Sequence, residues 1–195
     1  FEGGPQTFTH AHFDKGHFIL EAYGESLVTD PGMILYSYPG SAALKDSVCH
    51  NVATVGGKNQ SYLDASQAAV IRELSHGDRY ELLRADLSGS YKELRKYERT
   101  LLFVRSGYVL IMDRMESAEP GLKWHLHSKG EFRSAGSGDA CSVIHRFEAA
   151  ADRAGMHAAI AADRPLMPSF RSYAYADVLL SHCLTLSPGE GVHEL

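Results

Sequence analysis

The residues best suited to chemistry lie in the first quarter of the chain, where histidines and aspartates alternate with other residues. His10, His12 and Asp14 are spaced two apart, so a β-strand would project all three from one face. Two imidazoles and a carboxylate on one face are costly to bury unless they are paired or bind a cation. Asp30 and His50 follow beside later loops. Two histidines and one aspartate with an open fourth position form a typical zinc site, which the sequence therefore predicts.

Short strand-like runs separated by glycine and proline turns must position these residues. The clearest pair is a hairpin in which 99–105 and 108–113 flank a Ser-Gly linker. Helical periodicity is poor; 63–74 and 149–162 could each hold a turn or two of helix, although both overlap predicted strands. The other predicted strands are 17–23, 26–29, 33–38, 51–55, 69–74, 79–87, 122–127, 142–148, 156–161 and 173–186. We expect an all-β fold, a large antiparallel β-sandwich with little helix.

Length and composition narrow the class of protein. The chain has 195 residues and a net charge of −5, and its 44% hydrophobic residues suffice for a globular core. The absence of a basic run removes the electrostatic basis for binding nucleic acid, and no apolar stretch is long enough to cross a membrane. No linker or repeat divides the chain, so we expect residues 1–195 to form a single domain.

The chain opens at Phe1 without an initiator Met or a signal segment, and we interpret it as part of a longer protein. Cys49, Cys141 and Cys183 form no CxxC pair and cannot all pair internally. A reduced compartment fits this usage, and so does one disulfide with a spare thiol. Burial as small apolar side chains is the simplest role for each.

Several segments taken together resemble the heparinase II/III-like domain of bacterial lyases that act on heparin, heparan sulfate and alginate. The resemblance rests on His10-x-His12-x-Asp14, on Asp30-Pro31-Gly32 and on the run 50–55, His-Asn-Val-Ala-Thr-Val. Two later runs, 99–104 and 109–114, are similar to that family's hairpin. The match covers residues 9–115 well and the remainder by strand pattern. It implies a sandwich of the supersandwich type.

The resemblance implies that His12, Asp30 and His50 bind Zn²⁺, and that this ion organises the site rather than cleaving the bond itself. His10 is then the catalytic histidine, next to the metal without binding it. From its spacing, Asp14 is expected to hydrogen-bond to the histidines and to fix their tautomer and ring orientation.

The implied reaction is β-elimination at a uronate. A lyase removes the C5 proton and expels the C4 oxygen, so it needs donors that neutralise the carboxylate, a base and an acid. Histidine titrates near neutral pH and suits the first or second role, and tyrosine is the family's usual partner. The loop 39–49 contains no tyrosine, which leaves Tyr36 and Tyr38 just before it; of these we single out Tyr38.

The resemblance also implies partners and a location. Members of the family take several catalytic groups from an N-terminal α-helical toroid, and this chain shows no such helical region. We expect an acidic polysaccharide or oligosaccharide substrate to be bound jointly with that helical domain of the parent chain. The chain by itself is expected to show little or no activity. Family resemblance points to the bacterial periplasm or the cell exterior.

Other polar residues receive structural assignments. His17 would lie on the opposite strand face from the His-x-His pair. The run 124–127, Trp-His-Leu-His, could form a sugar-facing surface, but no carboxylate lies nearby to complete a metal site. His182-Cys183 is too small a ligand set, and Asp113-Arg114 is interpreted as a strand-end ion pair or turn. Solvated surface is expected for Lys58, Arg72, Arg79 and Arg84.

Two rival functions stay open on the sequence alone. A cupin-type metalloenzyme also uses His-x-His in a β-barrel, but its glutamate should follow closely, and no glutamate occurs here between His12 and Glu21. The second rival is a non-catalytic, carbohydrate-binding β-domain that a metal ion staples together. Metal analysis and an assay for unsaturated uronate products separate these possibilities.

Overall fold

The computed structural model describes residues 1–5, 10–61, 68–105, 107–117, 119–137, 144–150, 155–161, 166–175 and 178–188. Within these ranges the chain forms strands and short 3-10 helices and no α-helix. The 3-10 helices are η1 (Ser41–Lys45), η2 (Ser47–Cys49) and η3 (Ser88–Ser90). The strands are β1 (Gly4–Pro5), β2 (Leu20–Ala22), β3 (Glu25–Val28), β4 (Ala53–Val55), β5 (Ala68–His76), β6 (Tyr80–Asp86), β7 (Leu94–Val104), β8 (Tyr108–Ser117), β9 (Leu122–Ser128), β10 (Glu131–Ser137), β11 (Ile144–Ala150), β12 (Gly155–Ala161), β13 (Leu166–Tyr175) and β14 (Val178–Pro188). No helix in the described ranges is long and apolar enough to cross a membrane.

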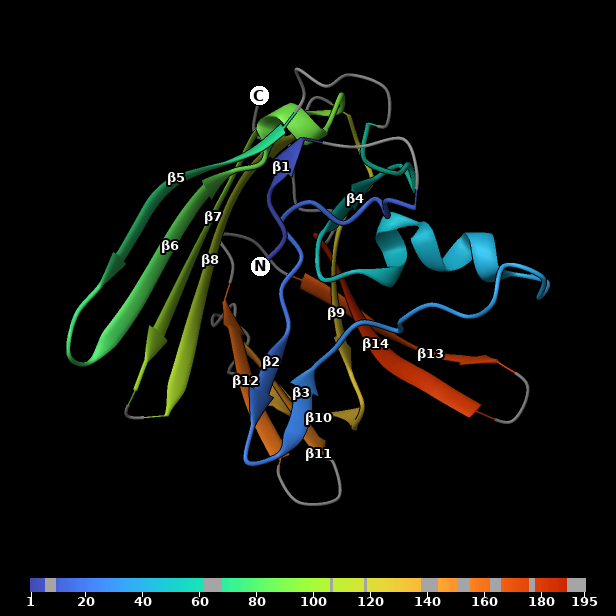
Figure 1. The fold of residues 1–195 in the computed structure, drawn as a ribbon. Coiled ribbons are helices and arrows are strands. Elements are labelled where there is room, and N and C mark those ends of the chain that lie inside the picture. The colour runs from blue at the N-terminus through green and yellow to red at the C-terminus, as the bar shows by residue number, and fades with distance from the viewer. Residues whose placement is uncertain are drawn as a thin grey trace.

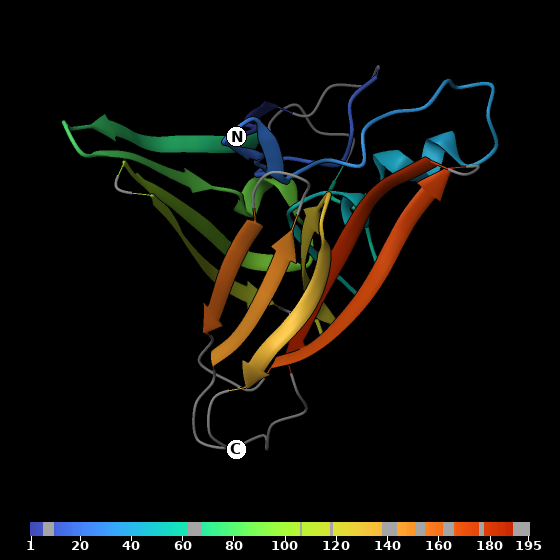
Figure 2. The ribbon, with the colours of Figure 1, turned by 90° about the horizontal axis from the view of Figure 1, so that it is seen from below.

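The strands form antiparallel sheets that face one another. One layer is the five-stranded sheet β1-β5-β6-β7-β8. Opposite it lie the four-stranded sheet β13-β14-β9-β4 and the three-stranded sheet β10-β11-β12, with the β2-β3 pair alongside (Figure 1). Figure 2 shows the molecule from below, with the five-stranded sheet in green on the left and strands β13 and β14 in orange and red on the right. The predicted all-β antiparallel sandwich with little helix is confirmed.

The core fills the space between the layers. Phe18, Leu126 and Leu184 are buried there, and Leu101 of β7 and Ile111 of β8 pack against them from the opposite sheet. Burying one such side chain stabilises the fold by about 1.5–3 kcal/mol. A second cluster ties β4 to the base of the five-stranded sheet; its buried members are Ala53, Val55, Ala69, Ala85, Leu87, Tyr91, Leu94 and Tyr97. Both layers are therefore fixed at the end of the sandwich where the polar site lies.

The predicted hairpin is confirmed as β7 and β8, whose register begins with Val104 opposite Tyr108. Gly107 lies in the turn with φ +116°, a backbone conformation that side chains with a Cβ rarely adopt. Its N–H donates to the Val104 carbonyl at 2.9 Å. Alternating aliphatic residues in both strands explain why this pair was readable from the sequence.

Replacing Gly107 with alanine is expected to lower the free energy of unfolding by about 1–2 kcal/mol. An added Cβ would meet no atom within 4 Å, so the cost comes from the backbone conformation alone. Urea denaturation of the variant measures it. Gly3→Ala is the matched control, because Gly3 lacks a positive φ and its Cβ would have ordinary contacts from 3.5 Å outward. Equal stability of the two variants would contradict the backbone argument.

Several predicted elements differ from the structure. Residues 33–38 form turns rather than a strand, and the region predicted as 173–186 is two strands, β13 and β14. The helical alternatives are wrong in the described parts of 63–74 and 149–162, because β5, β11 and β12 occupy them. Cys141 lies outside the described residues. Cys49 and Cys183 are free and buried, as expected of small apolar side chains.

Candidate metal and catalytic centre

The His-x-His segment is a loop, so the predicted strand with His10, His12 and Asp14 on one face is wrong. His10 has φ +61°, which ends any extended run at that point. The backbone of the segment is held by distant loops instead of a neighbouring strand: Phe13 N–H donates to the Lys45 carbonyl at 2.9 Å. Lys15 N–H donates to Gln60 Oε1 at 2.8 Å. The loop still brings its histidines to the end of the sandwich.

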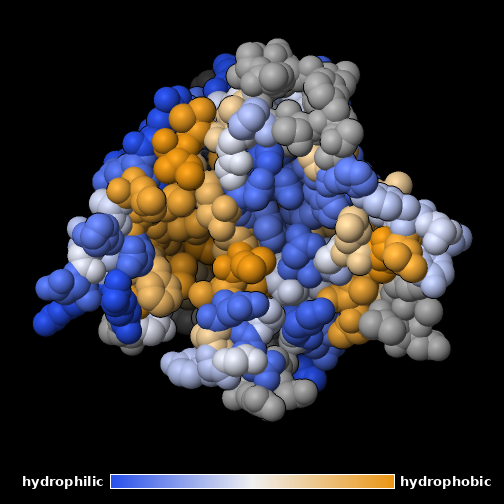
Figure 3. Space-filling model, viewed as in Figure 1, coloured by the Kyte–Doolittle hydropathy of each residue, from blue (hydrophilic) through white to orange (hydrophobic). Residues whose placement is uncertain are grey.

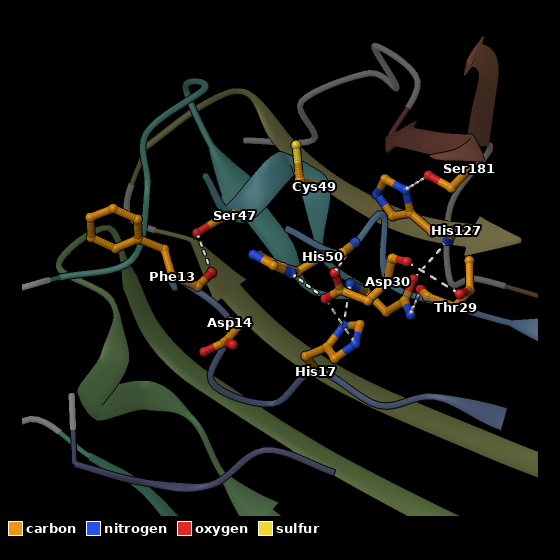
Figure 4. A network of polar contacts seen from close by, with 12 residues as sticks. Phe13, Asp14, His17, Thr29, Asp30, Ser47, Cys49, His50, His127 and Ser181 are labelled. Atoms are coloured by element: carbon orange, nitrogen blue, oxygen red, sulfur yellow. Dashed lines mark hydrogen bonds and ion pairs between the residues drawn. The ribbon is translucent and has the colours of Figure 1, made fainter. Parts of the chain in front are cut away.

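Asp30 and His50 meet although twenty residues separate them. Asp30 Oδ2 lies 2.9 Å from Nδ1 of His50, and Asp30 Oδ1 accepts the Gly32 N–H at 2.6 Å within the Asp-Pro-Gly turn. His50 follows η2 and is completely buried. Figure 4 shows the two side chains facing each other, with Asp14 and His17 nearby. The strand-end aspartate and the later histidine therefore converge as the sequence predicted.

His12 completes the cluster from the opposite loop, with its ring centroid 5.2 Å from that of His50. The ligand atoms of His12, Asp14 and His50 lie within 4.8 Å of one another, and so do those of His17, Asp30 and His50. The predicted ligand set takes His12 from the first of these groups and Asp30 from the second, with His50 in common. The structure thus places His12 and Asp30 each close to His50 but in different groups, alongside Asp14 and His17 respectively.

A cation fits these residues because two ring nitrogens are orphaned. Nε2 of His50 and Nε2 of His17 are buried and have no hydrogen-bond partner among the described residues. A buried ring nitrogen without a partner is destabilising, and binding a cation removes that cost. Nδ1 of His50 lies 2.9 Å from Asp30 Oδ2, so an Nδ1–H hydrogen bond to that carboxylate leaves the Nε2 lone pair for a cation.

The electrostatics of the cluster favour ligand-ready protonation states. Burial raises the pKa of Asp30, but the hydrogen bond and charge of His50 and the Gly32 N–H outweigh it and bring that pKa to about 2. Burial, with the neighbouring His50, lowers the pKa of His12. Burial also raises the pKa of Asp14, although His50 and Lys15 oppose this. A neutral His12 and an ionised Asp30 are the forms that bind metal at neutral pH.

His10 lies beside this cluster and pairs with a tyrosine. Its Nδ1 is 2.7 Å from Tyr36 Oη, and the two ring centroids are 5.6 Å apart. Both side chains are exposed, and the ammonium group of Lys45 lies 4.9 Å from the centre of the Tyr36 ring. Of the two candidate tyrosines, the structure pairs Tyr36 with His10, whereas the sequence singled out Tyr38. An exposed His–Tyr pair next to a positive charge can move a proton to and from an anionic ligand.

Three residues that support the cluster were not identified from the sequence. Asn51 donates from Nδ2 to the carbonyls of Phe18 at 2.8 Å and Thr29 at 2.9 Å. Arg99 donates from Nη1 to the carbonyls of Gly16 and Asn51. His17 lies against Asp30 rather than on an opposite face. The His-Asn dipeptide was the available signal for Asn51, while nothing in the pattern of β7 distinguished Arg99.

Of the other polar residues assigned from the sequence, some lie where they were expected and others do not. Asp113 is paired with Arg99 inside the sheet, so the predicted strand-end pair with Arg114 is wrong. The predicted sugar-facing surface at 124–127 is also wrong, since His125 and His127 are buried. His125 contacts the Thr54 and Thr185 hydroxyls, and His127 contacts Ser181 Oγ and the Val48 carbonyl, so their ring nitrogens are all used. The residues expected at the surface are exposed there: Lys58, Arg72, Arg79 and Arg84.

Comparisons with known proteins agree with this architecture. A model of the family "Heparinase II/III-like, C-terminal" matches residues 1–178. A heparin-sulfate lyase from Bacteroides stercoris is 29% identical over 155 residues, which are 75% of this chain and 22% of that enzyme. A mutant of the heparan sulfate lyase HepC from Pedobacter heparinus superposes over 95% of this chain with a TM-score of 0.72 at 20% identity. A heparinase III superposes over 96% with a TM-score of 0.65 at 17% identity.

The chain covers only part of these relatives: 22% of the Bacteroides lyase, and 30% and 29% of the two structures. The structural likeness, at this identity, bears on the fold, and the family match extends over most of the chain. Together with the sandwich, the family match leads to one assignment. The chain belongs to the heparinase II/III-like family and corresponds to its C-terminal domain.

Proposed function

We propose that this chain is the zinc-binding domain of a polysaccharide lyase that cleaves a uronic-acid polymer by β-elimination. The observation that carries the proposal is the exposed His10–Tyr36 pair, 2.7 Å apart, on the loop that brings the half-buried His12 to the buried His50, which also contacts the half-buried Asp30. The relatives that the chain matches are named heparin-sulfate and heparan sulfate lyases. Those names favour a substrate of the heparin or heparan sulfate type, and the family resemblance adds an alginate type as a second possibility.

The pair supplies the proton transfers that the reaction needs. The C5 proton of the uronate passes to a base, and the C4 oxygen receives a proton as its bond to carbon breaks. Tyr36 Oη and His10 Nδ1 share one hydrogen across their short contact, so one can accept a proton while the other returns it. Tyr36 of the pair lines an open pocket of about 450 Å³, together with Met33, Leu35 and Tyr38.

Lys45 serves the substrate carboxylate. A uronate loses its C5 proton readily only when the negative charge of the neighbouring carboxylate is neutralised. Lys45 Nζ lies 4.9 Å from the centre of the Tyr36 ring and is half-buried, so its ammonium group stands where such a carboxylate would meet the pair. It is one donor of the set that neutralisation requires, and the remaining donors are proposed to come from an N-terminal α-helical domain of the parent chain.

His12, Asp30 and His50 would hold the metal ion. Zinc bound there supplies positive charge and a rigid centre, and it organises the loop that bears His10. Asp14 is the neighbouring carboxylate that we propose orients the histidines, and burial raises its pKa. A lyase of this kind works where it meets polysaccharide, and we propose the bacterial periplasm or the cell exterior as its location.

Replacing Tyr36 with phenylalanine in the full-length parent protein is expected to lower kcat at least about a hundredfold, because the hydroxyl that transfers the proton is lost. The formation of the unsaturated uronate is followed by its ultraviolet absorbance on heparin, heparan sulfate and alginate. Tyr38→Phe is the matched control and should leave kcat within about threefold of the parent. A parent protein that binds these polymers without forming product would favour the carbohydrate-binding alternative, and an unchanged Tyr36→Phe enzyme would exclude Tyr36 from the reaction.

Zinc content tests the metal site separately. We expect about one zinc per chain, and we expect His12→Ala, Asp30→Asn and His50→Ala each to weaken zinc binding about a hundredfold, because each removes a ligand. Asp14→Asn should weaken it less than about tenfold if the carboxylate only orients the histidines. Competition with a chromogenic chelator measures all four variants. Retention of zinc by Asp30→Asn, with its loss from Asp14→Asn, would move the third ligand to Asp14.

A further inference from the structure

His17 lies within the proposed metal centre, close enough to Asp30 and His50 to be a further candidate ligand. It is buried, its Nε2 is 3.4 Å from Asp30 Oδ2, and its ring centroid is 5.5 Å from that of His50. Its ligand atom belongs to one of the two close groups at this centre, together with those of Asp30 and His50. Geometry alone would therefore allow His17 to replace His12 as the third ligand.

The hydrogen bond on the other side of the ring decides its tautomer. Nδ1 of His17 lies 3.0 Å from the backbone nitrogen of Asn51, and a backbone N–H can only donate. Nδ1 therefore accepts, its lone pair is used, and it carries no hydrogen. A neutral imidazole has one N–H, so that hydrogen must be on Nε2, which faces Asp30. In this state the ring has no lone pair left for a cation.

Asn51 cannot turn away to release this constraint, because both of its amide groups are fixed. Its side chain donates to the Phe18 and Thr29 carbonyls and accepts the His127 N–H at 2.7 Å. Its own carbonyl accepts from Nη1 of Arg99. Asn51 is thus held by His127 of β9 and by Arg99 of β7. Because the fold fixes the Asn51 N–H in place, it also fixes the tautomer of His17.

We infer that His17 is a positioning residue of the metal centre: its Nε2–H donates to Asp30 Oδ2 and aims that carboxylate, and the ring itself is not a ligand. This inference rests on the proposed zinc site and deepens it, because it leaves His12 rather than His17 as the histidine that binds zinc together with His50. The present 3.4 Å contact is longer than a hydrogen bond, so the carboxylate must approach the ring by a few tenths of an ångström when the bond forms. Hydrogen-bonded partners of this kind commonly tune metal affinity.

The nitrogen resonances of the His17 ring test the tautomer directly. In protein labelled with ¹⁵N-histidine, two-bond ¹H–¹⁵N correlation spectra distinguish a protonated Nε2 from a bare or metal-bound one, and the His17→Gln spectrum assigns the signal. We expect Nε2–H in the metal-free protein and again after one equivalent of zinc. Loss of that proton on zinc addition, or Nδ1–H in the metal-free protein, would overturn the inference. A chain that binds no zinc would count against the proposed metal site, while the metal-free spectrum would still decide the tautomer.

Zinc affinity tests the positioning role. His17→Leu removes the donor and is expected to weaken zinc binding about 10- to 100-fold, whereas His17→Gln keeps an N–H near the Nε2 position and should recover most of that loss. His50→Ala provides the scale for losing a true ligand. Zinc binding by His17→Gln as weak as that of His50→Ala would make His17 a ligand and overturn the inference. Unchanged affinity in a folded His17→Leu protein would also overturn it.

Discussion

Replacing Arg99 with leucine is expected to lower the free energy of unfolding by about 3–5 kcal/mol, because it leaves a buried carboxylate without its partner. Arg99 is fully buried and carries two donors to Asp113. Trp124 Nε1 and Tyr97 Oη also contact Asp113 Oδ2, at 2.8 Å and 3.1 Å. These two neutral groups cannot balance the carboxylate charge once the guanidinium is gone.

The substitution also releases two backbone carbonyls next to the proposed metal centre. Nη1 of Arg99 donates to the Gly16 carbonyl at 2.7 Å and to the Asn51 carbonyl at 2.6 Å. Both acceptors lie in loops that carry site residues, and a buried carbonyl without a donor costs about 1–3 kcal/mol. The loss of stability should therefore be accompanied by weaker zinc binding.

Urea denaturation in the presence of a chelator measures the stability term. The double variant Arg99→Leu/Asp113→Leu should be less destabilised than the sum of the two single variants, because the second substitution removes the orphaned charge. Exposed pairs provide the control: Arg72→Leu, which breaks the surface contact with Asp86, should cost less than about 1 kcal/mol. A comparably small effect for Arg99→Leu would show that the buried network does not hold the layers together.

Acidification from pH 7 to pH 5 is expected to lower the free energy of unfolding by about 4 kcal/mol through His125 and His127. Burial lowers the pKa of His125 from 6.5 to about 3 and that of His127 from 6.5 to about 4. Both stay neutral in the folded chain while they take up protons in the unfolded chain below pH 6.5. Their stabilisation is therefore complete above that value and is lost as the pH falls toward the folded-state values, at about 1.4 kcal/mol per pH unit for each ring.

The slope of stability against pH separates this cause from general acid denaturation. His125→Gln can still reach the hydroxyls of Thr54 and Thr185 but cannot titrate, so its loss of stability between pH 7 and pH 5 should be smaller by about 2 kcal/mol, whatever its absolute stability. His17, whose pKa burial lowers to about 3, contributes to the pH dependence that remains. The measurements are made in chelator, because loss of zinc would add its own pH dependence. An unchanged slope in His125→Gln would show that other groups cause the acid lability.

The parts of the fold that the sequence predicted are those in which local pattern decides the structure. Alternating aliphatic residues and a Gly-containing turn identified the β7–β8 hairpin, because cross-strand contacts and turn geometry act over a few residues. A two-residue spacing gave a wrong prediction at 10–14, where the alternating residues are His10, His12 and Asp14. There, spacing alone suggested a strand, but the backbone partners of the segment are Lys45 and Gln60, far away in the chain.

The candidate site was predicted in its residue types and only partly in its arrangement. His12 and Asp30 both lie close to His50, but in two different groups of possible ligands, so the three-residue zinc set implied by the resemblance stays a prediction. His17 was missed because the rule of alternate faces holds only within a strand, and its loop turns the ring back toward Asp30. Tyr36 was passed over in favour of Tyr38 for a similar reason, since turns rather than a strand direct the 33–38 segment.

The long-range connections of Asn51 have a consequence for the order of folding. Its side chain joins segments that are 22, 33 and 76 residues away in the chain, and its carbonyl accepts from Arg99 of β7 in the opposite sheet. The candidate metal centre is therefore complete only when strands from both layers have docked. Contacts of such separation form late and slowly. If the proposed zinc site is correct, zinc binding should follow the formation of secondary structure during refolding, and bound zinc should slow unfolding more than it speeds folding.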